Sequence, residues 1–271
     1  MPAVQVSRGP LPGLYLVMDF ITAAEEAALL RQLDAEGPSR SHNKKKAWRS
    51  SAFNGRCDSQ SFGVKTEHQG GFVRCNVPAD GEKDIPTYML PLMRRIQSLR
   101  PSIEASIAAA CGGGSDSSSG SGGGSGGGVG GESRENASAA ALALQSFSGL
   151  RLNEFNANSY EREKGHFLRE HVDDRFLSGP ILANLSLLDS CSMRYMAEKS
   201  TRCVLHGAPT SADVWLPRRC LQIVSGPARY DYSHSIPTAL LGRQRRVSLT
   251  FRQAGHKKYG VRAAYVGGTM V

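Results

Sequence analysis

The order of hydrophobic and polar positions divides the chain into a first part typical of helices and a second part typical of short strands. Thr22 to Glu25 reads Thr-Ala-Ala-Glu, a capping box in which the hydroxyl and the carboxylate satisfy free amides at a helix start. The residues behind it bring apolar side chains to one helix face: Ala28, Leu29 and Leu33. Gly37 and Pro38 end this helix, and a second helix is predicted from Pro86 to Leu99, ahead of Pro101.

The second part of the chain carries short β-type runs separated by turn residues. The predicted strands are Leu150–Tyr160, Ile181–Leu188, Ser192–Met196, Cys220–Ser225, Arg246–Arg252 and Val261–Val266. Many short strands at roughly even spacing indicate a sandwich or barrel rather than a parallel α/β sheet. We therefore expect an α+β fold in which an N-terminal helical layer packs against a β body.

A glycine- and serine-rich stretch separates the two parts. Residues 112–131 contain twelve glycines and six serines, a composition that behaves as a flexible coil because it cannot bury apolar surface. It matches the G-x-G-x-x-G pattern trivially, without a preceding strand, so a surface insertion is favoured over a phosphate-binding loop. The prediction is one domain over residues 1–271: N-terminal helices and a basic loop (1–111), a flexible insertion (112–132) and the β core (133–271).

Charge is concentrated in one N-terminal segment. The chain has 33 Lys and Arg against 24 Asp and Glu, a net charge of +9, which favours an acidic partner such as nucleic acid or anionic lipid. Six of these cations, and no acidic residue, lie between Ser39 and Cys57: Arg40, Lys44, Lys45, Lys46, Arg49 and Arg56. Trp48 and Phe53 lie among them. Such a mixture suits phosphates and a stacked base, and a solvated basic loop is the alternative.

Cysteine usage and the N-terminus point to an intracellular protein. The six cysteines are scattered without a C-x-x-C pair, which favours reduced thiols over a disulfide framework or a zinc ribbon. The apolar run from Leu14 to Val17 is cut short by Asp19, so neither a secretion signal nor a transmembrane span is predicted. We expect a monomer in the nucleus or cytoplasm, without membrane association.

Three residues of the second part have the side chains of a metal site. His171 and Asp173 are two apart, so in an extended segment both point to the same side. His234, from a later strand, would complete a face of two imidazoles and one carboxylate, which is the ligand set of non-haem Fe(II) oxygenases. Alone, an H-x-D pattern is a weak signal.

The strand predicted from Arg246 to Arg252 carries an unusual polar face. Alternation places Val247, Leu249 and Phe251 on one side and Arg246, Ser248, Thr250 and Arg252 on the other. A site for a small dianion explains two arginines with two hydroxyls, because guanidinium groups bind carboxylates in a bidentate manner. An exposed face of an edge strand is the alternative reading.

These motifs together resemble the AlkB family of Fe(II)- and 2-oxoglutarate-dependent dioxygenases. The order His171-x-Asp173, His234, then Arg246 and Arg252 as R-x5-R is similar to the family pattern. The stretch from Arg246 onward resembles the family's R-x-x-L-T-F-R. Asn158-Ser159-Tyr160 looks like its N-x-Y, and residues 13–15 look like its N-terminal entry. With Asp174 directly after the H-x-D and Leu185-Ser186-Leu187-Leu188 following, the chain looks most like the branch that contains the fourth animal AlkB homologue and related plant and algal proteins.

The resemblance implies a double-stranded β-helix, or jelly-roll, core and an oxidative demethylase. Fe(II) would be held by His171, Asp173 and His234, with 2-oxoglutarate and O2 as cosubstrates. The residues implied to contact 2-oxoglutarate are Asn158, Tyr160, Arg246, Ser248, Thr250 and Arg252. Oxidation of an N-methyl group would release succinate, CO2 and formaldehyde.

Three substrate hypotheses follow. The first is N-methylated DNA or RNA, because the basic segment lies where the family keeps its substrate-recognition lid. The residues that would contact it are Lys44, Lys45, Lys46, Trp48, Arg49, Arg56 and Asp174. The second is the same chemistry on a methylated lysine of a protein. The third is a non-catalytic binding module that keeps a structural metal.

Overall fold

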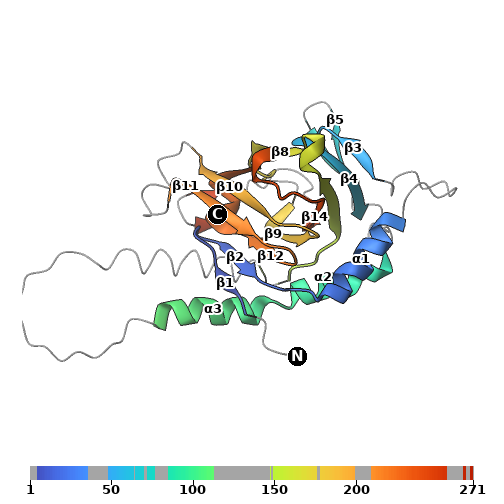
Figure 1. Ribbon diagram of the computed structural model, residues 1–271. Helices are drawn as coiled ribbons and strands as arrows, with labels where there is room; N and C mark the ends of the chain where they lie inside the picture. The colour runs from blue at the N-terminus through green and yellow to red at the C-terminus, as the bar shows by residue number, and fades with distance from the viewer. Residues whose placement is uncertain are drawn as a thin grey trace, which may run out of the picture.

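The computed structural model is built around one antiparallel sheet that folds over on itself (Figure 1). The residues that the structure describes are 5–35, 48–63, 65–69, 72–76, 85–112, 147, 149–175, 178–198, 209–254, 265–266 and 269–270. The main sheet runs in the order β1-β2-β12-β9-β14-β7-β4-β8-β13-β10-β11, with β3 paired to β4. Its strands are β1 (Ser7–Arg8), β2 (Leu14–Val17), β3 (Arg49–Ser51), β4 (Gly55–Gly63), β7 (Glu154–Tyr160), β8 (Phe167–His171), β9 (Ser178–Leu187), β10 (Cys191–Ala197), β11 (Ser211–Leu216), β12 (Leu221–Val224), β13 (Tyr232–Ile236) and β14 (Arg246–Ala254).

Strand β4 joins the two halves of this sheet. Its residues Asp58 to Gly63 pair with β7, whereas Gly55 and Arg56 pair with β8. The half built on β9, β14 and β7 therefore continues into the half built on β8, β13 and β10. Between them lies the space that holds the candidate site.

Helices cover the outer side of the larger half (Figure 1). They are α1 (Ala23–Ala35), α2 (Leu90–Gln97) after a 3-10 turn at Thr87–Met89, and α3 (Arg100–Gly112). A short helix, α6 (Gly226–Tyr230), precedes β13. Further 3-10 turns lie at Arg162–Lys164 and Thr238–Leu240, and two small hairpins form from β5 (Lys65–Gln69) with β6 (Phe72–Asn76) and from β15 (Tyr265–Val266) with β16 (Thr269–Met270).

Alternation along β14 sets which side chains face the helices and which face the interior. Val247, Leu249 and Phe251 are fully buried in the same apolar cluster as Leu33 of α1 and Ile96 of α2. The intervening polar residues line the cavity between the two sheet halves. The predicted two-sided strand is thus what the structure contains.

The capping box is also present as predicted. The amide of Glu25 donates to Thr22 Oγ1 at 3.1 Å, and the amide of Thr22 donates to Glu25 Oε2 at 2.7 Å. Leu29 and Leu33 face the core, whereas Ala28 is exposed. The α+β class and the helical layer against a β body are confirmed.

The prediction that residues before the insertion are mostly helical was wrong in part. Residues 49–63 form β3 and β4, and Leu14–Val17 forms the fully buried β2. Strand β4 gave no signal because Ser59 and Ser61 point into a polar cavity, where an ordinary strand would carry apolar residues.

Helix α3 was not predicted, because Pro101 was taken as a terminator. Pro101 lies in the first turn of α3, where its missing N–H costs no hydrogen bond. Of the predicted strand Val261–Val266, only Tyr265 and Val266 belong to a described strand. The glycine-serine insertion lies outside the described residues beyond Gly112.

Candidate active site

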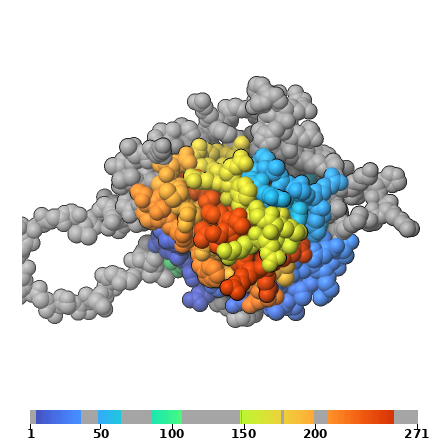
Figure 2. Space-filling view, turned by 45° about the horizontal axis from the view of Figure 1, so that its top comes forward, coloured from blue at the N-terminus to red at the C-terminus, as the bar shows by residue number. Residues whose placement is uncertain are grey.

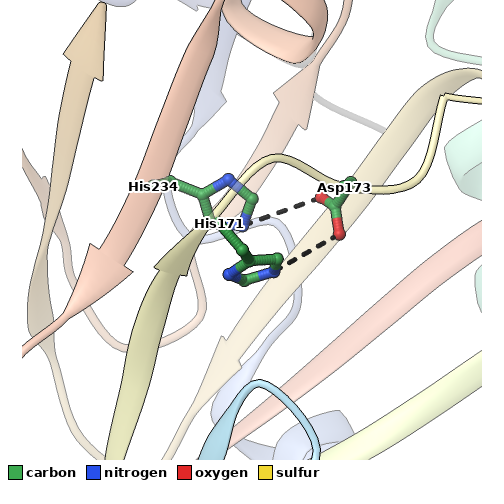
Figure 3. A group of neighbouring side chains, drawn as sticks. All are labelled: His171, Asp173 and His234. Atoms are coloured by element: carbon green, nitrogen blue, oxygen red, sulfur yellow. Dashed lines mark ion pairs between the residues drawn. The ribbon is translucent and has the colours of Figure 1, made fainter. Parts of the chain in front are cut away.

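The three predicted metal ligands converge on one point (Figure 3). His171 is the last residue of β8 and lies opposite His234 of β13 in the sheet register. Asp173 follows β8 by two residues, and its carboxylate oxygens lie 3.6 Å from His171 Nε2 and 3.7 Å from His234 Nε2. The ligand atoms of the three side chains all lie within 4.8 Å of one another.

The electrostatics of this group favour an ionised Asp173 carboxylate beside a neutral His234 imidazole. Burial opposes ionisation of Asp173, but the two histidines outweigh it and lower the pKa of its carboxyl group. Burial lowers the pKa of His234 to about 4, so this imidazole is neutral at pH 7. For His171 burial acts in the same direction, but Asp173 and the Arg169 carbonyl outweigh it and raise the pKa.

His171 is oriented by its second ring nitrogen. Its Nδ1 lies 2.7 Å from the Arg169 carbonyl oxygen, which leaves Nε2 directed at Asp173. A backbone carbonyl on the remote nitrogen is the usual way in which proteins fix the tautomer of a metal-binding histidine. This arrangement therefore presents a free Nε2 lone pair to a metal.

A cavity of about 290 Å³ adjoins the three ligands. All nine residues predicted for metal and cosubstrate line it: Asn158, Tyr160, His171, Asp173, His234, Arg246, Ser248, Thr250 and Arg252. They come from four strands, β7, β8, β13 and β14, and from the segment after β8. Residues far apart in the chain therefore meet in one place.

Arg246 has the environment expected of a carboxylate-binding residue. Its side chain is 1% exposed, and its Nη2 donates to Ser186 Oγ at 2.8 Å. Its Nε and Nη1 are buried and have no hydrogen-bond partner among the described residues. Leaving buried guanidinium donors unpaired is costly, so the site has the donors that a small carboxylate would satisfy. Tyr160 lies opposite Arg246 in the β7–β14 register, and the Arg246 Cζ is 5.9 Å from its ring centroid.

Arg252 lies at the other end of the cavity. It is six residues from Arg246 on β14, which corresponds to roughly 20 Å along an extended strand. Its Nε lies 3.0 Å from Glu154 Oε1 on β7, so Arg252 already has a carboxylate partner. The two arginines therefore cannot hold the same carboxylate group.

The predicted substrate residues are not gathered at the cavity. Lys44, Lys45 and Lys46 lie outside the described residues. Arg49 and Arg56 are exposed on β3 and β4, and Arg56 alternates with the cavity-lining Cys57, so it faces away.

Trp48 is engaged by the protein itself. Its Nε1 donates to Asp34 Oδ1 at 2.9 Å, and the Arg245 Cζ lies 5.0 Å from its ring centroid. Arg245 in turn forms two hydrogen bonds with the Asp34 carboxylate. This cluster fastens the end of α1 to the start of β14. Asp174 is exposed, and its backbone carbonyl accepts a hydrogen bond from Arg229.

Two residues of functional interest were not among the predicted site residues. Phe53, in the turn between β3 and β4, is 69% exposed and lines the cavity together with Ser51 and Asn54. On the face shown in Figure 2, the strands on either side of Phe53, β3 and β4, lie beside the part of the chain that follows residue 150. The other residue, Arg229 of α6, lies beneath the segment that carries Asp173. The aromatic residue in the basic segment was a usable signal, whereas nothing in the sequence marked Arg229.

Comparison with known proteins decides the family. A family model, described as the 2OG-Fe(II) oxygenase superfamily, matches residues 13–252. The chain belongs to this superfamily. Within it, the chain is an AlkB-family oxygenase: it is 23% identical to "Alpha-ketoglutarate-dependent dioxygenase alkB homolog 4" of Homo sapiens, over 90% of this chain and 68% of that protein. The Mus musculus protein of the same name is 21% identical over the same shares.

The fold of a solved structure agrees with this assignment. "The structure of OsALKBH1" superimposes with a TM-score of 0.52 at 15% identity, covering 93% of this chain and all of that one. The predicted jelly-roll core of an AlkB-like oxygenase is thereby confirmed, and the chain is a dioxygenase that uses Fe(II), 2-oxoglutarate and O2. In the described part of this AlkB-family oxygenase, no helix is long and apolar enough to cross a membrane.

The residues present fit the cofactors of the family. His171, Asp173 and His234 supply the two imidazoles and one carboxylate that suit Fe(II), and Arg246 supplies unpaired donors for a cosubstrate carboxylate. When bound, Fe(II) with 2-oxoglutarate and O2 supplies the oxidising power for attack on a C–H bond. The protein contributes orientation of the bound groups, and Leu168, Met193 and Ile236 are the apolar residues that line the cavity together with the ligands.

Proposed function

We propose that this AlkB-family oxygenase removes methyl groups oxidatively from N-methylated nucleic acid. The observation that carries the proposal is the link between the cavity and the basic segment 39–57, which has a net charge of +6. Residues Ser51, Phe53 and Asn54 of this segment line the same cavity as the metal ligands. A nucleic-acid strand whose phosphates contact this basic segment would therefore bring a base to the cavity.

The chain's own residues divide the work between cosubstrate and substrate. Arg246, with Asn158 and Tyr160 beside it, would bind and orient 2-oxoglutarate at the inner side of the cavity. Phe53 would stack on the flipped-out methylated base at the outer side, since aromatic faces bind bases of any sequence. Hydroxylation of an N-methyl carbon gives a product that loses formaldehyde and leaves the unmethylated amine.

The test is a product assay on a panel of defined substrates. Purified protein with Fe(II), ascorbate and 2-oxoglutarate is incubated with N-methylated single-stranded DNA, N-methylated RNA and their unmethylated counterparts, and the oligonucleotides are weighed by mass spectrometry. We expect loss of the methyl mass from methylated oligonucleotides alone, with an equimolar increase in succinate over the amount formed without oligonucleotide. The His171→Ala variant serves as the inactive control. Turnover of 2-oxoglutarate without demethylation of any oligonucleotide would contradict the proposed substrate.

A methylated lysine in a protein is the second candidate, and the engagement of Trp48 favours it. Because Trp48 is held by Asp34 and Arg245, one of the two aromatic residues of the basic segment is not presented to a base. Methyl-lysine peptides therefore belong in the same panel. Binding to single-stranded DNA that weakens steeply with salt supports the nucleic-acid proposal, whereas demethylated peptide without such binding supports the lysine alternative.

A further inference from the structure

Asp173 is the metal ligand that no strand pairing holds. His171 and His234 lie on β8 and β13, where the sheet register sets them opposite each other. Asp173 lies beyond the end of β8, in residues 172–174, which have no regular secondary structure. Its carboxylate nevertheless reaches both imidazoles. Some other contact must therefore fix the segment that carries it.

Arg229 of α6 makes that contact. Its Nη2 donates to the carbonyl oxygen of Asp174 at 3.1 Å, and to the carbonyl oxygen and hydroxyl of Ser178 at 3.2 and 2.9 Å. Asp174 directly follows the metal ligand, and Ser178 begins β9. In return, Arg175 Nη2 donates to the carbonyl oxygen of Tyr230 at 2.7 Å. The segment after β8 is thus fastened to α6 at two points.

Arg229 is buried, and burying a guanidinium group costs free energy. The side chain is 2% exposed, and no carboxylate lies within ion-pair distance of it among the described residues. Its Nε and Nη1 lack hydrogen-bond partners there as well. Burying a cation without a carboxylate partner is costly, even though the Arg229 Cζ lies 5.0 Å from the Tyr230 ring centroid. The hydrogen bonds to Asp174 and Ser178 are therefore the contacts that hold this buried guanidinium in place.

The position of α6 in the chain gives this contact its consequence. Arg229 lies five residues before His234, and α6 leads directly into β13. One side chain therefore connects the segment that carries Asp173 to the element that positions His234. Because the positions of both Asp173 and His234 depend on this contact, a shift of α6 would separate the carboxylate from the imidazoles.

We propose that Arg229 is a positioning residue of the metal centre, which holds the segment after β8 so that Asp173 faces both histidines. It acts through the backbone of Asp174 and Ser178, and it contacts neither metal nor substrate. The inference rests on the metal site of the oxygenase family and is independent of the substrate proposed above.

The test measures metal affinity separately from stability. Mn(II) affinity of the metal-free protein over residues 1–271 is measured by titration followed by electron paramagnetic resonance, and the unfolding temperature is measured without metal. We expect Arg229→Met to weaken Mn(II) binding about 10- to 100-fold, the range usual for partners that orient a ligand. Arg229→Lys keeps the charge without the planar fork and should lie between Arg229→Met and the unchanged protein. Ser178→Ala, which removes one acceptor, should weaken binding severalfold.

A destabilised control separates positioning from general loss of structure. Leu33→Ala creates a cavity in the buried core under α1, within an apolar cluster that contains no residue of β8 or β13, and lowers the unfolding temperature. Its Mn(II) affinity should stay unchanged. Mn(II) binding by Arg229→Met within twofold of the unchanged protein would overturn the proposal. If Arg229→Met does not fold, unchanged affinity in both Arg229→Lys and Ser178→Ala would overturn it equally.

Discussion

His171 and His234 face each other across the β8–β13 pair, with ring centroids 4.5 Å apart and ring planes inclined by 52°. Each ring directs its Nε2 at a different oxygen of the Asp173 carboxylate. The sheet register therefore fixes the two imidazoles, and the carboxylate closes the group from a third side. The metal site consists of two positions set by strand pairing and one set by a segment outside the sheet.

Removing either histidine should abolish metal binding while leaving the fold intact. His171→Ala and His234→Ala each take away one of three protein ligands, and we expect Mn(II) binding to fall by at least about 100-fold, more than for a supporting residue. The measurement is the same metal titration, with far-ultraviolet circular dichroism to verify the fold. Replacement of His166, which is buried but accepts a hydrogen bond from the Glu161 amide outside the site, should leave metal affinity unchanged. Metal binding that survives in His234→Ala would contradict the assigned ligand set.

Arg246 should determine affinity for 2-oxoglutarate. Replacing it with methionine removes the unpaired Nε and Nη1 donors, and truncating one partner of a buried charge pair costs about 2–5 kcal/mol. We expect the KM for 2-oxoglutarate to rise at least about 30-fold, with Mn(II) affinity of the cosubstrate-free protein unchanged. The matched control is Arg194→Met, which removes an exposed arginine that pairs with Asp213 on the outer face of β10 and β11. Equal effects of the two substitutions would argue against a carboxylate site at Arg246.

The sequence was sufficient to predict that the proposed metal and cosubstrate residues meet at one cavity, in part because the spacing of the β14 residues reflects the geometry of a strand. The polar residues of β14 alternate with apolar ones, so the side of the sheet that they share could be read from the sequence. His171 and Asp173 were grouped by their two-residue spacing, although Asp173 lies beyond the end of β8 and strand geometry does not hold it. The family pattern then joined His234 to them. What joins these segments in space is the register of β13 with β8 and of β14 with β7, which no single sequence displays.

Two kinds of feature could not be predicted from the sequence: a strand whose inward-facing residues are polar, and contacts between residues that are distant in the sequence. Strand β4 carries serines toward the cavity, so it lacks the alternation that marks a strand. Arg229 looks like any other arginine in a short helix, and only the folded chain brings Asp174 and Ser178 to it. Trp48 is the reverse case, since its aromatic ring in a basic segment predicted substrate contact, while Asp34 and Arg245 come to it from distant positions.

The ion pair between Arg252 and Glu154 should stabilise the sheet at the end of the cavity away from Arg246. The Glu154 side chain is largely buried, which raises its pKa against the opposing charge of Arg252. Glu154→Gln leaves the Arg252 charge without its counterion, and we expect the free energy of unfolding to fall by about 1–3 kcal/mol. Chemical denaturation checks this value. The double variant Glu154→Gln with Arg252→Met should recover part of the loss, and a double variant less stable than the sum of its singles would contradict the pairing.

The capping box at Thr22 should contribute to the stability of the fold without affecting catalysis. Thr22→Ala removes the hydroxyl that accepts the Glu25 amide hydrogen bond, and loss of such a cap costs about 1 kcal/mol. For a protein of this size the unfolding temperature should fall by about 2–4 °C. Thr22→Ser keeps the hydroxyl and serves as the control. A change in the KM for 2-oxoglutarate in Thr22→Ala would show that α1 affects the site, contrary to this expectation.

Phe53 should govern substrate binding without affecting the reaction of cosubstrate alone. It lines the outer side of the cavity with 69% of its surface exposed, whereas Arg246 and the metal ligands lie on the inner walls. If it stacks on a base, Phe53→Ala should lose about 1–3 kcal/mol of binding and raise the KM for a methylated oligonucleotide about tenfold. Succinate formation in the absence of substrate should not change, since that reaction needs only the metal and cosubstrate residues. Trp215→Ala is the matched control, because Trp215 is an exposed aromatic on β11 that does not line the cavity. Equal losses in both variants, or a fall in substrate-independent succinate formation in Phe53→Ala, would place Phe53 outside the substrate path.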